Sequence, residues 1–241
     1  MQRKLDQNKI KPVIRLSCKE LVIVADTTFF SRKNGLAVFR EPNLKKNVWW
    51  RDTVYETADL YRSGREHLEN SGLIIKGVVL DGRRGIRGVF ENIPTQMCHF
   101  HQKQIVKRYL TTRPKLEASR ELKEIVKTLA DTNEQALADK LNNWHEKWKD
   151  FLKQKTTNPE TGRWSYTHKR IRSAYRSLKT NLPHLFTYQK FPELNMPNTT
   201  NSLDGFFNRL KSLLNVHRGL SPKRRKRLAI EILIGKINFR S

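Results

Sequence analysis

Two short apolar segments that each end in an aspartate constrain this chain more than any other feature. Residues 21–25 read Leu-Val-Ile-Val-Ala and precede Asp26, and residues 78–80 read Val-Val-Leu and precede Asp81. Runs rich in β-branched residues are typical of buried strands. Two such strands at one sheet edge would bring both carboxylates together, where a divalent cation would relieve their repulsion. The alternative for each aspartate is a turn or cap that closes the strand.

Two more strands are expected between these segments. Residues 35–40 and 47–55 are rich in apolar and aromatic residues, and Asn34-Gly35 lies just before the first of them. Both residues of an Asn-Gly pair tolerate positive φ, which favours a tight hairpin there. The first three strands are therefore expected to form an antiparallel meander.

A helix is expected at 56–70, before the strand at 74–80. A strand, a crossover helix and a new strand usually form a parallel pair, so this strand is expected beside the one at 21–25. Asp26 and Asp81 would then end neighbouring strands. A short helix at 85–92 and a strand at 95–100 are expected to continue the sheet.

The pattern changes to helices after His101. Three apolar stripes with helical spacing predict an all-helical block over residues 103–197, and Thr132 to Gln135 reads as a capping box. Such stripes are most simply core positions. The expected organisation is a polar tail or linker at 1–20, a first part of the core at 21–102, the helical block at 103–197, and a C-terminal part of the core at 198–241.

The excess of positive charge indicates a polyanionic partner. The 241 residues include 48 Lys and Arg against 23 Asp and Glu, which gives a formal charge of +25. This charge favours nucleic acid, and no long apolar run suggests a membrane. Two cysteines, Cys18 and Cys98, fit a reducing cytosol, and no secretory signal is expected at the N-terminus.

A third acid is expected on a helix that starts at Asn201. The apolar residues 203, 206, 207, 210, 213 and 214 form one face, while Asp204, Asn208 and Lys211 share the opposite one. Two-metal phosphoryl transfer needs several converging carboxylates, which Asp26, Asp81 and Asp204 would supply. The alternative for Asp204 is a structural role at the third position of a capping box.

Two further groups of residues could act beside these acids. Cys98 and His101 form a Cys-x-x-His pair, which is only half of a zinc site. The alternative is a strand end with polar tips. Cations suited to phosphate contacts follow Asp81 and occur near the C-terminus. They are Arg83, Arg84, Arg87, Lys211, Lys223, Arg224, Arg225, Lys226 and Arg227.

Four motifs follow one another in a specific order. They are Val-Ala-Asp-Thr-Thr at 24–28, Val-Val-Leu-Asp-Gly-Arg-Arg-Gly at 78–85, Cys-His-Phe-His at 98–101, and Thr-Thr-Asn-Ser-Leu-Asp-Gly-Phe-Phe-Asn-Arg-Leu-Lys at 199–211. Their order resembles the Mutator-type transposases of bacterial insertion sequences. The resemblance covers the chain from about residue 20 to about residue 235.

The resemblance implies an α/β RNase H-like core of order β-β-β-α-β-α-β with an all-helical insertion before the last acid. It implies cleavage and joining of double-stranded DNA at element ends and target, with two Mg²⁺ or Mn²⁺ ions on Asp26, Asp81 and Asp204. Cys98 and His101 match a pair that family members carry near the site. The expected enzyme is a homo-oligomer on DNA in the bacterial cytoplasm, associated with the nucleoid when bound.

Two departures from the family pattern keep alternatives open. The third acid is usually glutamate, whereas Asp204 is one methylene, roughly 1.5 Å, shorter. Family members usually carry a DNA-reading domain before the core, so this chain is expected to be only the catalytic part. The alternatives are a catalytically inactive DNA-binding remnant and an RNase H-like, structure-selective nuclease.

Overall fold

The computed structural model describes residues 19–83, 85–217 and 219–235. The tail expected at 1–18, Cys18 and the DNA contact predicted for Arg84 lie outside these residues. The chain divides into two compact units, residues 1–78 with 201–241, and residues 79–200. The second unit starts earlier than the helical block predicted at 103–197. Among the described residues, no helix is long and apolar enough to cross a membrane.

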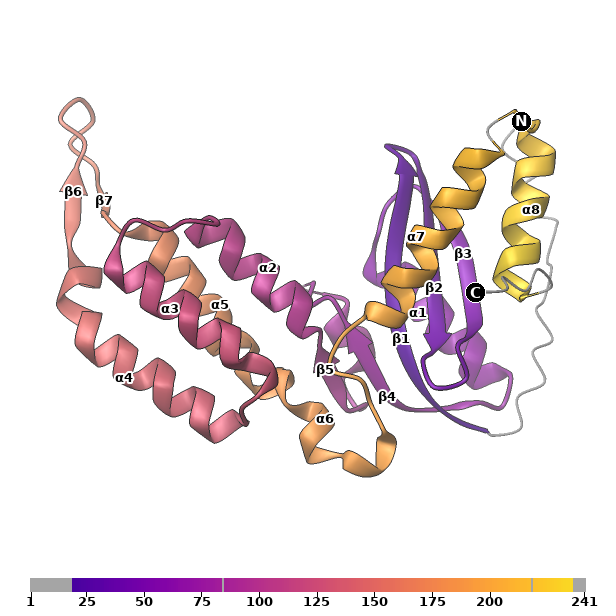
Figure 1. Cartoon of the computed structure of the whole chain (residues 1–241), viewed down its shortest axis with the longest axis horizontal. Helices are drawn as coiled ribbons and strands as arrows, with labels where there is room; N and C mark the ends of the chain where they lie inside the picture. Colours follow the sequence, from indigo (N-terminus) through magenta and orange to yellow (C-terminus); the bar gives the residue numbers. More distant parts are fainter. Residues whose placement is uncertain (1–18, 84, 218, 236–241) are drawn as a thin grey trace. The chain divides into compact units, whose positions relative to one another are not determined.

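A five-stranded sheet in the order β3-β2-β1-β4-β5 organises the α/β fold (Figure 1). The strands are β1 (Glu20–Ser31), β2 (Asn34–Glu41), β3 (Lys46–Thr53), β4 (Ile74–Leu80) and β5 (Thr95–Met97). The first three form the predicted antiparallel meander. Strand β4 lies beside β1, as predicted. The amide of Ile74 donates to the carbonyl of Lys19 at 2.7 Å, so these two strands start together and run in the same direction.

Strand β1 is longer than the sequence predicts. It continues past Asp26 to Ser31, and Asp26 lies opposite Val38 of β2. The prediction that Asp26 ends its strand is therefore wrong. The residues after it, Thr-Thr-Phe-Phe, favour extended backbone, and β2 supplies a partner along their length.

The predicted hairpin between the first two strands is present, but its turn does not fall on Asn34-Gly35. Both residues belong to β2, and the turn falls on Arg32 and Lys33. Gly35 serves a different purpose, because a Cβ there would lie 2.7 Å from the ring of Phe29 on the facing strand. Glycine therefore allows the ring of the facing strand to lie across the backbone.

Helix α1 (Ala58–Asn70) covers one face of the sheet. Thr57 caps it by accepting from the amide of Leu60 at 3.2 Å. Its Tyr61 lies 5.6 Å, centroid to centroid, from Phe39 of β2, which in turn lies 4.8 Å from Trp49 of β3. All three rings are buried. This aromatic group anchors the helix that begins just after the third strand.

Replacing Gly64 of α1 with alanine is expected to lower the free energy of unfolding by about 1 to 2 kcal/mol. A Cβ there would lie 2.7 Å from the ring of Phe39 and 2.9 Å from that of Trp49. Because this Cβ would clash with two rings at once, the overpacking cost should fall in the upper part of the usual range of about 1–3 kcal/mol, and the gain of about 1 kcal/mol in helix propensity offsets only part of it. Urea unfolding measures the change.

Gly205→Ala is the matched control, because a Cβ at this helical position meets no atom within 4 Å. This variant is expected to keep or raise the stability. A Gly64→Ala protein as stable as the wild type would contradict the packing described for α1.

The opposite face of the sheet carries the two C-terminal helices of the first unit. Helix α7 (Asn201–Val216) packs against β1, α8 (Pro222–Ile234) packs against β3, and the two helices contact each other. Helix α7 buries Leu203, Phe207, Leu210 and Leu214. Phe206 and Leu213 are only half-buried, so the buried stripe is narrower than the predicted apolar face.

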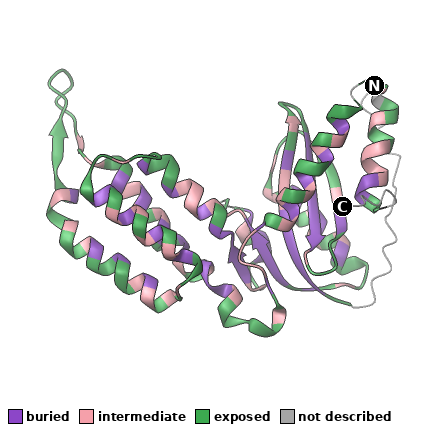
Figure 2. Cartoon of the chain, viewed as in Figure 1, coloured by how far each residue is buried: buried purple, intermediate pink, exposed green. Residues whose placement is uncertain are grey.

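The second unit is largely helical and has its own core. Its elements are η2 (Arg87–Phe90), α2 (His99–Leu110), α3 (Glu117–Lys127), η3 (Thr128–Ala130), α4 (Glu134–Lys153), β6 (Lys155–Thr157), β7 (Trp164–Tyr166), α5 (Lys169–Leu185), α6 (Thr187–Lys190) and η4 (Pro192–Leu194). Helices α2 to α5 pack on one another, and the predicted stripes line their core. Figure 2 shows the buried positions facing inward along these helices.

Three details of the second unit differ from the prediction. The block is not all-helical, because β6 and β7 form a hairpin. The strand at 95–100 ends at Met97 and gives way to α2, so His101 lies on a helix. The N-cap of α4 is Asn133 rather than Thr132, since Asn133 accepts from the amide of Ala136 at 2.9 Å.

Candidate metal centre

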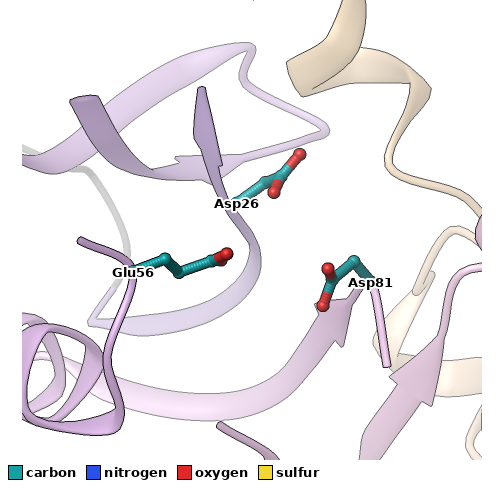
Figure 3. Close-up of side chains that lie close together, drawn as sticks. All are labelled: Asp26, Glu56 and Asp81. Carbon is teal, nitrogen blue, oxygen red and sulfur yellow. The ribbon is translucent and has the colours of Figure 1, made fainter. Parts of the chain in front are cut away.

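Three acids gather where the sheet and α1 meet. Asp26, Glu56 and Asp81 each offer a carboxylate oxygen, and these oxygens all lie within 4.8 Å of one another (Figure 3). All three side chains are half-buried. Within the described part of the chain, no other trio of His, Cys, Asp or Glu side chains comes this close. Two of the three are acids that the sequence predicts, and Glu56 is an addition.

The position of Asp26 follows from its place in β1. Alternate residues of a strand share one face, and residues directly opposite in an antiparallel pair point the same way. Val24 lies opposite Arg40, and Asp26 lies opposite Val38. The Asp26 side chain therefore leaves the sheet on the same face as Arg40. Its Oδ1 also accepts from the amide of Thr27 at 2.7 Å.

Glu56 is held by a buried tyrosine. The hydroxyl of Tyr61 donates to Oε1 of Glu56 at 2.7 Å and lies 3.3 Å from Oγ1 of Thr27. Burial raises the pKa of Tyr61 well above its usual value, and the carboxylates of Glu56 and Asp26 raise it further. The phenol therefore stays protonated as a donor. This hydrogen bond fixes a glutamate that precedes the cap of α1 and belongs to no regular element.

Asp81 directly follows β4, as predicted. Its Oδ1 accepts from the amide of Arg83 at 2.9 Å, so the turn weighed as the alternative role is present. That turn requires glycine next, because Gly82 has φ +88° and a Cβ there would lie within 3 Å of Met97. A carboxylate has about four acceptor positions, so one bond to an amide leaves capacity for a cation.

The donor set fits a hard divalent cation such as Mg²⁺. Mg²⁺ and Mn²⁺ prefer carboxylate oxygens as ligands, whereas softer metals prefer sulfur or imidazole nitrogen. Ligands lie about 2.0–2.1 Å from Mg²⁺, so two of them are at most about 4.2 Å apart. The three acids are already within 4.8 Å, so a modest inward movement of their side chains would let them share one ion.

Asp204 is half-buried on the first turn of α7 and does not belong to the group of three. Nevertheless, its helix covers the sheet face from which Asp26 points. The Nε of Arg40 donates to Oγ of Ser202 at 3.1 Å, and the guanidinium lies 5.2 Å from the centroid of the Phe206 ring. Asp26 and Asp204 therefore lie on the same side of the sheet, and Asp204 stays a predicted ligand.

Arg40 links the sheet to the helices on this face of the first unit through hydrogen bonds. Its Nη1 donates to Oδ1 of Asn47 at 2.7 Å, and the Asn47 amide donates to the carbonyl of Leu233 in α8 at 3.0 Å. Burial lowers the pKa of Arg40, with a further lowering from Arg209. The buried cation thus joins the sheet to both C-terminal helices, including the turn that carries Asp204.

Cys98 directly follows β5 and caps α2, whereas His101 lies in the first turn of α2 rather than at a strand end. Cys98 is buried, and the amide of Thr200 donates to its Sγ at 3.3 Å. Burial raises the pKa of Cys98, but hydrogen bonds from His101 and Thr200 lower it by more, so the net pKa is lowered. The amide of His99 donates to the carbonyl of Asn198 at 2.9 Å. Cys98 and the first residue of α2, His99, thus join this helix to the segment 198–200 of the second unit.

The predicted cations differ in their availability. Arg83 is exposed beside Asp81. Arg87 is half-buried and donates from Nη2 to Asn181 at 3.0 Å, an interaction within its own unit that gives it a structural role. Lys226 pairs with Asp52 at 3.0 Å, and Arg227 pairs with Glu231 at 3.1 Å. Lys211 is half-buried, Lys223 and Arg224 are exposed, and Arg225 is half-buried.

Sequence reasoning missed Glu56 because no motif contains it. It follows neither an apolar run nor a repeat, and the helix predicted at 56–70 includes it as the first residue, whereas the helix begins at Ala58. The available signal was an acid directly before a threonine N-cap, at the junction of the third strand and the first helix. Only the pairing of β1 with β4 brings this junction near the two aspartates.

Comparison with known proteins does not assign this chain to a family. No protein-family model matches it, and no curated protein matches it significantly. The functional interpretation therefore rests on the residues and their geometry.

Proposed function

We propose that this chain is a metal-dependent DNA transposase that cuts and joins DNA strands by phosphoryl transfer. The single observation that carries the proposal is the convergence of Asp26, Glu56 and Asp81 in a chain of formal charge +25. Converging acids are the means by which proteins hold the cations of phosphoryl transfer, and positive charge attracts the DNA backbone. The order of the four sequence motifs supports the transposase assignment.

The sheet order β3-β2-β1-β4-β5 and the helix between β3 and β4 support an RNase H-like core. In this interpretation the helices of the second unit are the insertion that separates the first two acids from Asp204. The insertion then accounts for most of the separation between Asp81 and Asp204 in the sequence.

Each acid has a distinct role in the proposed reaction. A bound divalent cation supplies an activated water and neutralises charge on the phosphate. Asp26 and Asp81 hold it from the two central strands, and Glu56 completes the set while Tyr61 keeps its carboxylate oriented. Asp204 contributes from α7 to a second cation. The 3′-hydroxyl freed by cleavage would then attack a phosphate of the target DNA, and the 3′-oxygen of the broken target strand would leave.

The cations are proposed to position the DNA without reading its sequence. Arg83 lies next to Asp81 and is exposed, so it is placed to contact the phosphate being cut. Lys211 and the basic residues of α8 would hold the flanking backbone, since contacts to phosphates give affinity and register rather than sequence preference. Two copies acting together on paired DNA ends are the proposed assembly.

A structure-selective nuclease is the second candidate, and Glu56 favours it. The acids brought together are Asp26, Glu56 and Asp81, a set that differs from the Asp26, Asp81 and Asp204 that the resemblance implies. A nuclease would use the same acids but would need no specific DNA ends. An inactive DNA-binding remnant is the remaining alternative.

Nicking of DNA by the purified wild-type chain tests the proposal. Supercoiled plasmid and an element-end duplex are incubated with Mg²⁺ or Mn²⁺, and nicked and joined products are separated on gels. Nicking that EDTA stops is expected. Joining of the end to the plasmid would favour the transposase, and nicking without joining would favour the nuclease. If the chain shows no metal-dependent nicking, the inactive DNA-binding remnant is favoured instead.

A further inference from the structure

The hairpin β6–β7 of the second unit is unused by the proposed chemistry. It links α4 to α5 and projects beyond their ends (Figure 1), and nearly all of it is exposed (Figure 2). Asn158 closes the loop, since its Oδ1 accepts from the amide of Glu160 at 2.8 Å and its own amide donates to the carbonyl of Arg163 at 2.9 Å. These hydrogen bonds show that the hairpin has a defined backbone structure.

One face of the hairpin carries both of its aromatic rings. Tyr166 lies opposite Lys155, and Trp164 lies opposite Thr157, so these four side chains point the same way. The Trp164 and Tyr166 rings meet edge to face with centroids 5.6 Å apart. Neither ring contributes to the core of the unit. Trp164 is 56% exposed, although tryptophan side chains are mostly buried in folded proteins.

Cations hold these rings in place. Nζ of Lys155 lies 3.9 Å from the centroid of the Trp164 ring, and the guanidinium carbon of Arg172 lies 3.6 Å from that of Tyr166. Each ring is therefore oriented by a cation over its face. Orientation in advance lowers the entropy cost of binding a planar partner.

The charge around the hairpin selects the class of partner. Residues 153–172 contain six Lys or Arg and one acid, Glu160. Lys155 and Arg163 are exposed and form no ion pair with a described residue. A second copy of the hairpin would bring like charges together, which disfavours self-association through this face. The positive charge and the exposed rings of the hairpin together match a polyanion that carries flat apolar groups.

We propose that this hairpin binds single-stranded DNA, with an unpaired base stacked on Trp164 and its phosphates held by Lys155 and Arg163. Bases inside a duplex are already stacked on both faces, so an exposed ring gains most from an unpaired base. Stacking on an aromatic side chain tolerates any base, so no sequence preference is expected. The choice of DNA rests on the proposed function, while the binding itself requires none of the acids.

Fluorescence anisotropy with a labelled single-stranded DNA 20-mer in EDTA tests the inference. Trp164→Ala is expected to weaken binding about tenfold, and Trp164→Phe to retain most of the affinity. Phe191→Ala, which removes another exposed aromatic ring of the same unit, is the matched control and is expected to bind like the wild type. Wild-type affinity of Trp164→Ala would overturn the inference.

Salt dependence separates stacking from charge. Trp164→Ala is expected to keep the wild-type slope of log affinity against log salt, while Lys155→Gln is expected to reduce the slope by about one phosphate contact. A changed slope in Trp164→Ala, or tighter wild-type binding to a matched RNA, would overturn the assignment. Unchanged thermal melting of Trp164→Ala is expected, since its ring is outside the core.

The same proteins distinguish this inference from the proposed function. Asp26→Asn is expected to lose nicking and to keep binding that depends on Trp164. If nicking fails while Trp164→Ala still weakens binding, the proposed function falls and the hairpin assignment stands. If nicking occurs while Trp164→Ala binds normally, the hairpin assignment falls alone.

Discussion

Asp26→Asn lowers the rate of metal-dependent DNA nicking by at least about 100-fold in the expected result. Asparagine keeps the shape of the side chain but removes its negative charge, so the three-acid group loses one of the carboxylates proposed to hold the cation. Metal-assisted stabilisation of the transition state is worth several kcal/mol, and each 1.36 kcal/mol is about tenfold in rate. Initial nicking rates on supercoiled plasmid measure the loss.

Binding and folding controls accompany this variant. DNA binding in EDTA is expected to remain, because the substitution removes a negative charge near the DNA rather than a contact to it. Asp59→Asn is the matched control, since Asp59 lies exposed on α1, outside the group of three. Nicking by Asp26→Asn at the wild-type rate would contradict a catalytic role for this acid.

Glu56→Gln is expected to lower the nicking rate by roughly 30-fold or more. Glutamine can still accept the hydrogen bond from Tyr61, so the variant changes the charge of the third ligand while keeping its anchor. This prediction separates the observed group from the set Asp26, Asp81 and Asp204 expected from sequence. Steady-state nicking over a range of Mg²⁺ concentrations measures it, and a higher Mg²⁺ requirement is expected.

Two other variants make the Glu56 result specific. Glu66→Gln changes an exposed acid on α1 that lies outside the group and is expected to nick like the wild type. Asp204→Asn is measured alongside. If Asp204→Asn loses activity while Glu56→Gln keeps it, the ligand set is the one expected from sequence, and Glu56 has no catalytic role.

Local pattern predicted much of the sheet, and pairing decided the rest. The β-branched runs before Asp26 and Asp81 indicated β1 and β4, and the crossover rule placed these strands side by side. The end of β1 could not be read in the same way, because Thr27 to Ser31 are extended only in partnership with β2. The length of β1 therefore depends on its pairing with β2.

Glu56 and the hairpin β6–β7 show a similar limit. Glu56 lies in a short junction, and its neighbours in space come from strands far away in the sequence. The hairpin lies within the block predicted to be all-helical, because strands of only three residues each give no clear strand pattern. The signal present was β-forming residues on both sides of the segment 158–162, which ends in a glycine with positive φ.

The most direct test of the central claim is to locate the cation itself. A crystal of the chain soaked in Mn²⁺ should show an anomalous peak bound by carboxylate oxygens of Asp26, Glu56 and Asp81, at about 2.0–2.2 Å from each. The account predicts that peak, and predicts its loss in a crystal of Asp26→Asn. An Mn²⁺ peak bound without Glu56, or no peak at these acids in the wild type, would contradict it.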